Sequence, residues 1–206
     1  MNASDRGLHW ENVYRTKGER EVSWFQETPS TSLELIRSIG ATRHSAFVDI
    51  GGGASRLVDA LVNEGYQAVT VLDLSDSALA AAKARLGQAA AGVTWIVADV
   101  IKWKPIQLFD VWHDRAAFHF LTDAADRSAY VKCLREALRP GGDAIIATFA
   151  PDGPERCSGL PVIRYDAASL GEVLGDNFIL VETRRHDHHT PMGSTQRFQF
   201  SVFRRV

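Results

Sequence analysis

Alternation between strand-like and helix-like segments is the feature that most constrains the fold of this chain. The strand-like runs are AFVDI (46–50), AVTVLD (68–73), VTWIVAD (93–99), FDVWH (109–113) and DAIIATF (143–149). Segments with helical spacing separate most of them, and strands that alternate with helices are joined by right-handed crossovers into a parallel sheet. The pattern predicts a Rossmann-like, doubly wound α/β fold with helices on both faces.

The C-terminal part of the chain has a different pattern. Runs FILVETRRHDHH (178–189) and QRFQFSVFRRV (196–206) flank the turn-rich stretch TPMGST. Because six residues are too few for a helical crossover, the two runs should form an antiparallel hairpin at the sheet edge. The sheet is therefore predicted to have seven strands, mostly parallel, with an antiparallel last strand.

The first 45 residues precede this alternation and read as a short helix, an aromatic loop and a second helix. The second helix opens with Thr31-Ser32-Leu33-Glu34, a capping-box pattern, and closes at Gly40. We expect residues 1–45 to form an N-terminal helical lid and residues 46–206 to form the core with its C-terminal hairpin. Both parts should belong to one domain, 1–206.

Composition narrows the class of protein. The 206 residues carry a net charge of −2, which gives no reason to expect a nucleic-acid partner. No apolar run approaches about 20 residues, and the N-terminus lacks the basic and apolar regions of a signal peptide. Two cysteines without CxxC spacing indicate neither a disulfide framework nor a metal site. We expect a cytoplasmic protein without a membrane partner.

A glycine-rich turn, Gly51-Gly52-Gly53, follows the first strand and precedes a helix that starts near Ser55. Such a turn lets the backbone approach a ligand closely. A nucleotide P-loop would need Gly-Lys-Ser/Thr where this chain has Arg56-Leu57-Val58. A dinucleotide fingerprint would need Gly or Ala at Arg56, so that pattern is broken as well.

Acidic residues at strand ends complete a more specific pattern. Asp49 lies two residues before the glycines, Asp73 ends the second strand and Asp99 ends the third. Together with the terminal hairpin, these residues resemble the class I S-adenosylmethionine-dependent methyltransferases, over residues 46–206. The family's third glycine is replaced by Ser55.

The resemblance implies S-adenosylmethionine as cofactor. Gly51 and Gly53 would pass beside its methionine part, Asp49 would organise the loop, Asp73 would hold the ribose and Asp99 the adenine amino group. The full set of expected cofactor-binding residues is Asp49, Gly51, Gly52, Gly53, Asp73, Leu74, Asp99, Val100, His113 and Trp24.

The loop after the fourth strand, HDRAAFHFLTD, supplies the catalytic candidates His113, Asp114 and Arg115. A histidine there could deprotonate a nucleophile, and an arginine could anchor an anionic group. The alternative is that Asp114 pairs with Arg115 structurally while His113 packs. The stretch also resembles the Asp-Arg-x-Ala element of thiopurine-type S-methyltransferases, which implies a thiol acceptor.

Other polar residues have weaker claims to a site. His119 is expected in the core and Cys157 as an ordinary packed thiol. His186 and His188 share a strand face and are expected over the pocket mouth, as a base or a polar wall, in preference to a metal site, so no metal is predicted. Trp10 and Tyr14, four residues apart on a helix, either cover the cofactor or close the domain.

The sequence thus predicts an S-adenosylmethionine-dependent methyltransferase acting on a small-molecule acceptor, with a thiol favoured. Three alternatives stay open. The first is a protein-lysine methyltransferase, with Trp24 and Phe25 forming a lysine channel. The others are a non-catalytic cofactor-binding module and, more distantly, an NAD-dependent oxidoreductase.

Overall fold

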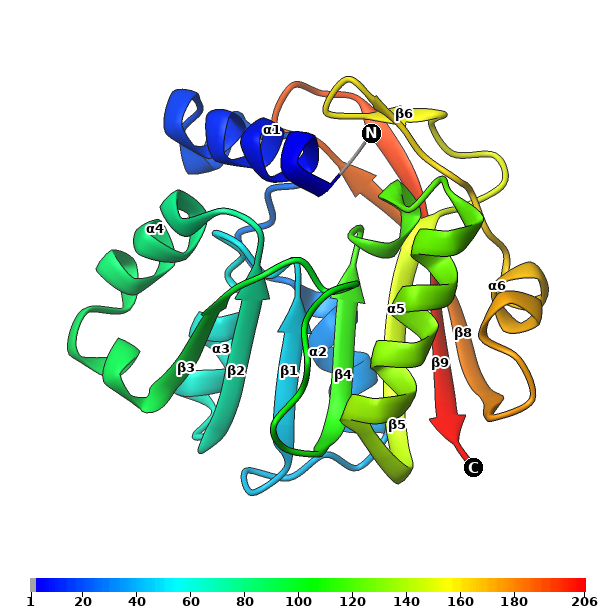
Figure 1. Ribbon diagram of the computed structural model, residues 1–206. Coiled ribbons are helices and arrows are strands. Elements are labelled where there is room, and N and C mark those ends of the chain that lie inside the picture. Colours follow the sequence, from blue (N-terminus) through cyan, green and yellow to red (C-terminus); the bar gives the residue numbers. More distant parts are fainter. Residues whose placement is uncertain (1–2) are drawn as a thin grey trace.

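The computed structural model describes residues 3–206; Met1 and Asn2, the first two residues of the expected lid, lie outside the described part (Figure 1). The helices are α1 (Ala3–Thr16), α2 (Ser30–Ser38), α3 (Leu57–Asn63), α4 (Asp76–Leu86), α5 (Ala124–Ala137) and α6 (Ala167–Leu174), with 3-10 turns η1 (Glu19–Glu21), η2 (Gly87–Gly92) and η3 (Phe118–Phe120). The main strands are β1 (Ala46–Ile50), β2 (Ala68–Asp73), β3 (Val93–Val97), β4 (Phe109–Arg115), β5 (Leu138–Phe149), β8 (Phe178–His189) and β9 (Thr195–Arg205).

The seven main strands form one sheet in the order β3-β2-β1-β4-β5-β9-β8. The pairs among β1 to β5 are parallel, whereas β9 is antiparallel to both β5 and β8. This arrangement confirms the predicted mostly parallel sheet with an antiparallel last strand. From β1 the chain adds β2 and β3 on one side of the sheet and then β4 and β5 on the other, so the strand order reverses between β1 and β4. Open α/β sheets bind ligands at such a reversal.

Each face of the sheet carries its own apolar core. Val48 and Trp112 point to the side covered by α5 and α6, where Tyr130 packs against them. Phe47 and Val111 point to the opposite side, which α2 and α3 cover. Because side chains alternate along a strand, neighbouring residues of β1 and β4 serve different layers.

Two helix ends are closed by local features of the sequence. The Ser75 hydroxyl accepts the Ala78 N–H of α4 at 3.1 Å. Gly65, just beyond α3, has a φ of 86° and closes that helix.

The capping box predicted at Thr31 to Glu34 is wrong, because α2 begins one residue earlier, after Pro29. Thr31 and Ser32 therefore lie inside the helix, and their hydroxyls contact His186 and His113 instead of capping it.

The expected lid divides into two parts. Helix α1 lies across the carboxyl ends of the strands, above β1 and β2 (Figure 1). Helix α2 instead packs on the sheet through Leu33, Leu35 and Ile36, which are buried in the second core. A two-stranded ribbon of β6 (Arg156–Cys157) and β7 (Leu160–Pro161), not predicted, follows β5. Within residues 3–206, no helix is long and apolar enough to span a bilayer.

Candidate active site

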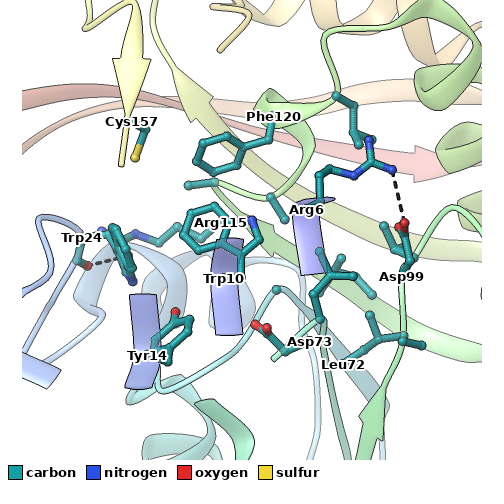
Figure 2. A pocket seen from close by; sticks show the side chains of 18 of the residues that line it. Arg6, Trp10, Tyr14, Trp24, Leu72, Asp73, Asp99, Arg115, Phe120 and Cys157 are labelled. Carbon is teal, nitrogen blue, oxygen red and sulfur yellow. Dashed lines mark hydrogen bonds and ion pairs between the residues drawn. The ribbon is translucent and has the colours of Figure 1, made fainter. Parts of the chain in front are cut away.

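A pocket opens at the carboxyl ends of β1, β2 and β4, beneath α1 (Figure 2). Its empty volume, counted together with the open space at its mouth, is about 840 Å³. One end, here the Asp99 end, is formed by Arg6 and Asp99, and Val100, the next residue in the chain, also lines the pocket. The opposite Cys157 end is formed by Trp24, Arg115, Phe120 and Cys157, together with Phe198, whose ring lies against Arg115.

The glycine turn forms the floor between these ends, and two of its residues have left-handed backbone conformations. Gly51 has a φ of 64° and Gly53 a φ of 47°. A Cβ atom on Gly51 would lie 2.8 Å from the Cβ of Ala117, and one on Gly53 would lie 2.7 Å from the Tyr14 hydroxyl. Side chains are excluded at both positions on two grounds. Of the three glycines Gly51 lines the pocket, whereas Gly52 and Gly53, also expected to contact the cofactor, do not.

Asp73 lies at the middle of the pocket, where β2 ends. Its Oδ1 accepts the Ser75 N–H at 2.8 Å. Burial, with a smaller contribution from the charge of Asp49, raises the pKa of Asp73 to about 7. A buried carboxylate with remaining acceptor capacity suits the hydroxyl donors of a ribose, and Leu74 beside it also lines the pocket.

At the Asp99 end, a residue that the sequence reasoning missed enters the site. The Arg6 guanidinium of α1 binds Asp99 through Nη2 at 3.2 Å and Asp126 of α5 through Nη1. Arg6, Trp10 and Tyr14 are spaced four residues apart and all line the pocket. That spacing on one helix face was the signal available for Arg6.

Aromatic rings enclose the centre of the pocket. Trp10 meets Trp24 and Phe120 edge to face, with ring centroids 5.6 Å and 5.0 Å apart. Tyr14 meets Trp24 in the same way at 6.2 Å. Trp24 therefore lies in the pocket wall. Ring faces of this kind attract a cationic centre such as a sulfonium.

Arg115 reaches the Cys157 end. Its Nη1 donates to the Trp24 carbonyl at 3.0 Å, and its guanidinium lies 5.2 Å from the Phe198 ring centroid. Its Nε and Nη2 are shielded from solvent and have no protein partner within residues 3–206. Burial lowers the Arg115 pKa to about 10, so the group stays charged at neutral pH. Nε and Nη2 form one edge of the guanidinium, which suits a carboxylate.

His113 lies below the pocket floor and does not line the pocket. Its Nδ1 is 2.7 Å from Oδ1 of Asp49 and its Nε2 is 2.9 Å from the Ser32 hydroxyl. Both ring nitrogens are engaged and the residue is 2% exposed, which argues against the expected roles as base and cofactor contact. Asp49 is likewise buried beneath the turn, where a Cβ on Gly52 would lie 2.6 Å from its Oδ2.

Asp114 points to the opposite face of the sheet from His113. It accepts the Ala117 N–H at 2.9 Å and the Tyr130 hydroxyl at 2.6 Å, together with the Phe118 N–H. Burial raises its pKa to about 6. The residue holds the turn after β4; it does not pair with Arg115 and does not line the pocket, so the structure gives no support for a catalytic role.

The weaker candidates fall in varied places. Cys157 lines the pocket, where an ordinary packed thiol was expected, and burial raises its pKa to about 11. His119 is buried in the core, and burial lowers its pKa to about 3. The His186 ring contacts the Thr31 hydroxyl. The His188 ring contacts the Ser23 carbonyl, and this contact holds the segment that carries Trp24. In the described part of the chain, no three metal-ligating side chains gather.

Comparisons with known proteins agree with the fold and the pocket described above. A family model described as a methyltransferase domain matches residues 47–142. Thiocyanate methyltransferase 1 of Arabidopsis thaliana is 28% identical over 191 residues, covering 89% of this chain and 80% of that protein.

Two solved structures share the fold at 22% identity and a TM-score of 0.75. One is the 1,6-didemethyltoxoflavin-N1-methyltransferase of Burkholderia thailandensis, covering 98% of this chain and 89% of that one. The other comes from work on the conversion of a disulfide bond into a thioacetal group during echinomycin biosynthesis, and covers 97% and 92%. The family match over residues 47–142 and the fold, with the glycine turn and strand-end acids of its pocket, support a class I S-adenosylmethionine-dependent methyltransferase.

Proposed function

We propose that the acceptor is a small molecule that is methylated on a thiol. The observation that carries this proposal is the composition of the Cys157 end. Among the described residues there, Trp24, Arg115, Phe120, Cys157 and Phe198, none is a proton acceptor at neutral pH. An acceptor in this position has to reach its nucleophilic form without a general base from the protein.

The ionisable groups nearby support this interpretation. The Cys157 thiol stays protonated because burial raises its pKa to about 11. Asp73 and Asp99 lie away from this end, and both ring nitrogens of His113 are engaged. A free thiol has a pKa of about 8.5, so a useful fraction is thiolate near neutral pH, whereas a lysine amine has a pKa of about 10.4.

The cofactor residues keep the roles expected from the family resemblance, with two changes. Asp73 holds the ribose, Asp99 the adenine, and Leu74 and Val100 flank them. Arg115, through its free Nε and Nη2 edge, holds the carboxylate of the methionine part. Asp49 and His113 act from below by fixing the glycine turn.

When bound, the cofactor supplies an electrophilic methyl group on a sulfonium sulfur. The protein then contributes alignment and the exclusion of water, which is what an in-line displacement requires. The aromatic walls and the shielded Cys157 end fit that contribution. The relative named for thiocyanate supports an acceptor with a sulfur nucleophile.

The protein-lysine alternative has less support. Its expected channel needs Trp24 and Phe25 side by side, but only Trp24 lines the pocket. Phe25 instead lies against the guanidinium groups of Arg20 and Arg56. Their Cζ atoms are 5.7 Å and 5.6 Å from the centroid of the Phe25 ring.

The proposal places the protein in the cytoplasm, without a nucleic-acid partner. Its two cysteines are free thiols, as the reducing cytosol favours. The net charge of −2 offers no general attraction to a polyanion.

Incubation with methyl-tritiated S-adenosylmethionine tests the acceptor. Small thiols are compared with alcohols and amines of the same carbon skeleton, and a lysate is separated into protein, soluble small molecules and volatile products. We expect label in the thiol products only. Label confined to protein would overturn the proposal, and binding of S-adenosylhomocysteine without any transfer would favour the non-catalytic alternative.

A further inference from the structure

Arg6 is the most buried cation of the pocket wall, and its hydrogen-bonding capacity is incompletely used. Its side chain is 7% exposed and that of its partner Asp99 is 10% exposed. Nη1 and Nη2 bind Asp126 and Asp99, but Nε is shielded from solvent and has no protein partner within residues 3–206. A shielded donor without a partner is costly unless a ligand completes it.

The geometry of a guanidinium determines where that donor points. Nε and Nη2 project from the same edge, and Nη2 is the atom that binds Asp99. The free N–H therefore lies next to a carboxylate, and both residues line the same end of the pocket. This end presents one donor and one acceptor side by side.

Adenine presents the complementary pair. Its exocyclic amino group is a donor, and on either side of it lies a ring nitrogen that is an acceptor. An amino group facing Asp99 would leave one of these ring nitrogens facing the Arg6 Nε. A base with a carbonyl in place of the amino group would set two acceptors against each other at Asp99.

We propose that Arg6 reads the adenine base of the cofactor, donating from Nε to the ring nitrogen beside the amino group that Asp99 accepts. Arg6 is thereby a specificity-determining residue supplied by helix α1. This assignment rests on the proposed placement of the adenine at Asp99 and does not depend on the nature of the methyl acceptor.

A competing explanation is that Arg6 only fastens α1 to the core through Asp99 and Asp126. The two explanations predict different effects on binding when a single ring nitrogen is deleted from the ligand. If Arg6 only fastens the helix, its loss weakens every cofactor analogue equally. If Nε contacts the base, an analogue that lacks the contacted ring nitrogen binds the wild type more weakly than the parent ligand does. Substitution of Arg6 should then abolish this difference in affinity.

The experiment measures binding of S-adenosylhomocysteine and its 1-deaza and 7-deaza analogues to the full chain, by calorimetry or by intrinsic tryptophan fluorescence. We expect one deaza analogue to bind the wild type about tenfold or more weakly than the parent. In Arg6→Gln this penalty should fall to within about twofold.

Asp126→Asn is the matched control, because Asp126 binds Arg6 without lining the pocket. It should weaken all three ligands by a similar factor and keep the deaza penalty. If Arg6→Gln does not fold, Arg6→Lys, which keeps the charge but lacks Nε, replaces it. Deaza penalties that are absent in the wild type, or that survive in the Arg6 variant, would overturn the assignment.

Discussion

His113 of β4 lies beside Asp49 of β1, its partner in the strand register, and the two side chains meet at 2.7 Å between Nδ1 and Oδ1. A carboxylate only accepts, so Nδ1 carries the proton of this hydrogen bond, and Nε2 lies 2.9 Å from the Ser32 hydroxyl. A chain of hydrogen bonds thus runs from α2 through β4 to the residue beneath the glycine turn.

Breaking this chain should destabilise the fold. His113→Phe leaves the Asp49 carboxylate buried without its partner, and we expect a loss of about 3 kcal/mol in the free energy of unfolding. Urea denaturation measures this loss, with Ser32→Ala as a milder comparison costing about 1 kcal/mol. In His113→Asn, the pH dependence of kcat should keep its wild-type shape; a lost limb of the profile would restore His113 as a base.

Arg115 should contribute mainly to cofactor affinity. Because its Nε and Nη2 have no protein partner, Arg115→Gln removes a charged fork from the proposed carboxylate. Calorimetry with S-adenosylhomocysteine should show affinity at least about tenfold lower. The same titration with S-adenosylhomocysteamine, which lacks the carboxylate, should show little difference between variant and wild type. An unchanged Kd for the first ligand would refute the carboxylate role.

Asp73 should make cofactor binding pH-dependent. Burial raises its pKa from 3.8 to about 7, so between these values the folded protein keeps a proton that the unfolded chain has lost. The contribution of Asp73 to stability is therefore full below pH 3.8 and is lost as the pH rises to about 7.

Ribose hydroxyls donate best to the ionised carboxylate, so affinity for S-adenosylhomocysteine should increase from pH 5.5 towards 7 and then level off. Calorimetry at pH 6 in buffers of different ionisation enthalpy should detect proton release on binding. Asp73→Asn should bind more weakly and show neither effect.

Cys157 should react slowly despite lying in the pocket. Its pKa of about 11 leaves little thiolate at pH 7.5, and iodoacetamide labelling should accelerate about tenfold per pH unit above that. Labelling followed by mass spectrometry measures this, and Cys133, whose pKa burial raises to about 12, is the internal comparison. Cys157→Phe should raise the acceptor KM and leave the S-adenosylhomocysteine Kd unchanged.

The strand pattern was sufficient to predict the sheet, because its strands are short apolar runs bounded by turn residues. The predicted strands 46–50 and 68–73 have the same first and last residues in the structure. Asp73 and Asp99 were predictable as pocket residues for a related reason: parallel strands end at one edge.

Contacts across the sheet were not predictable in the same way. Ser32 was interpreted only as part of a capping-box pattern at a helix start, because its partner, His113, is 81 residues away in sequence and leaves no local signal. Arg6 gave no sign of pairing with Asp99, 93 residues on, for the same reason. Local patterns report local hydrogen bonds, whereas these polar groups find partners only after the layers pack.

The pocket draws on residues as far apart as Arg6 and Phe198. During synthesis, Arg6 leaves the ribosome long before Phe198 does. Strand β9 must then pair with β5 and β8 before Phe198 reaches its position in the pocket. A nascent chain therefore gains no stabilisation from the complete ligand site until β9 has emerged. Translation pauses upstream of residue 195 would prolong the interval in which the aromatic residues of α1 lack their final partners.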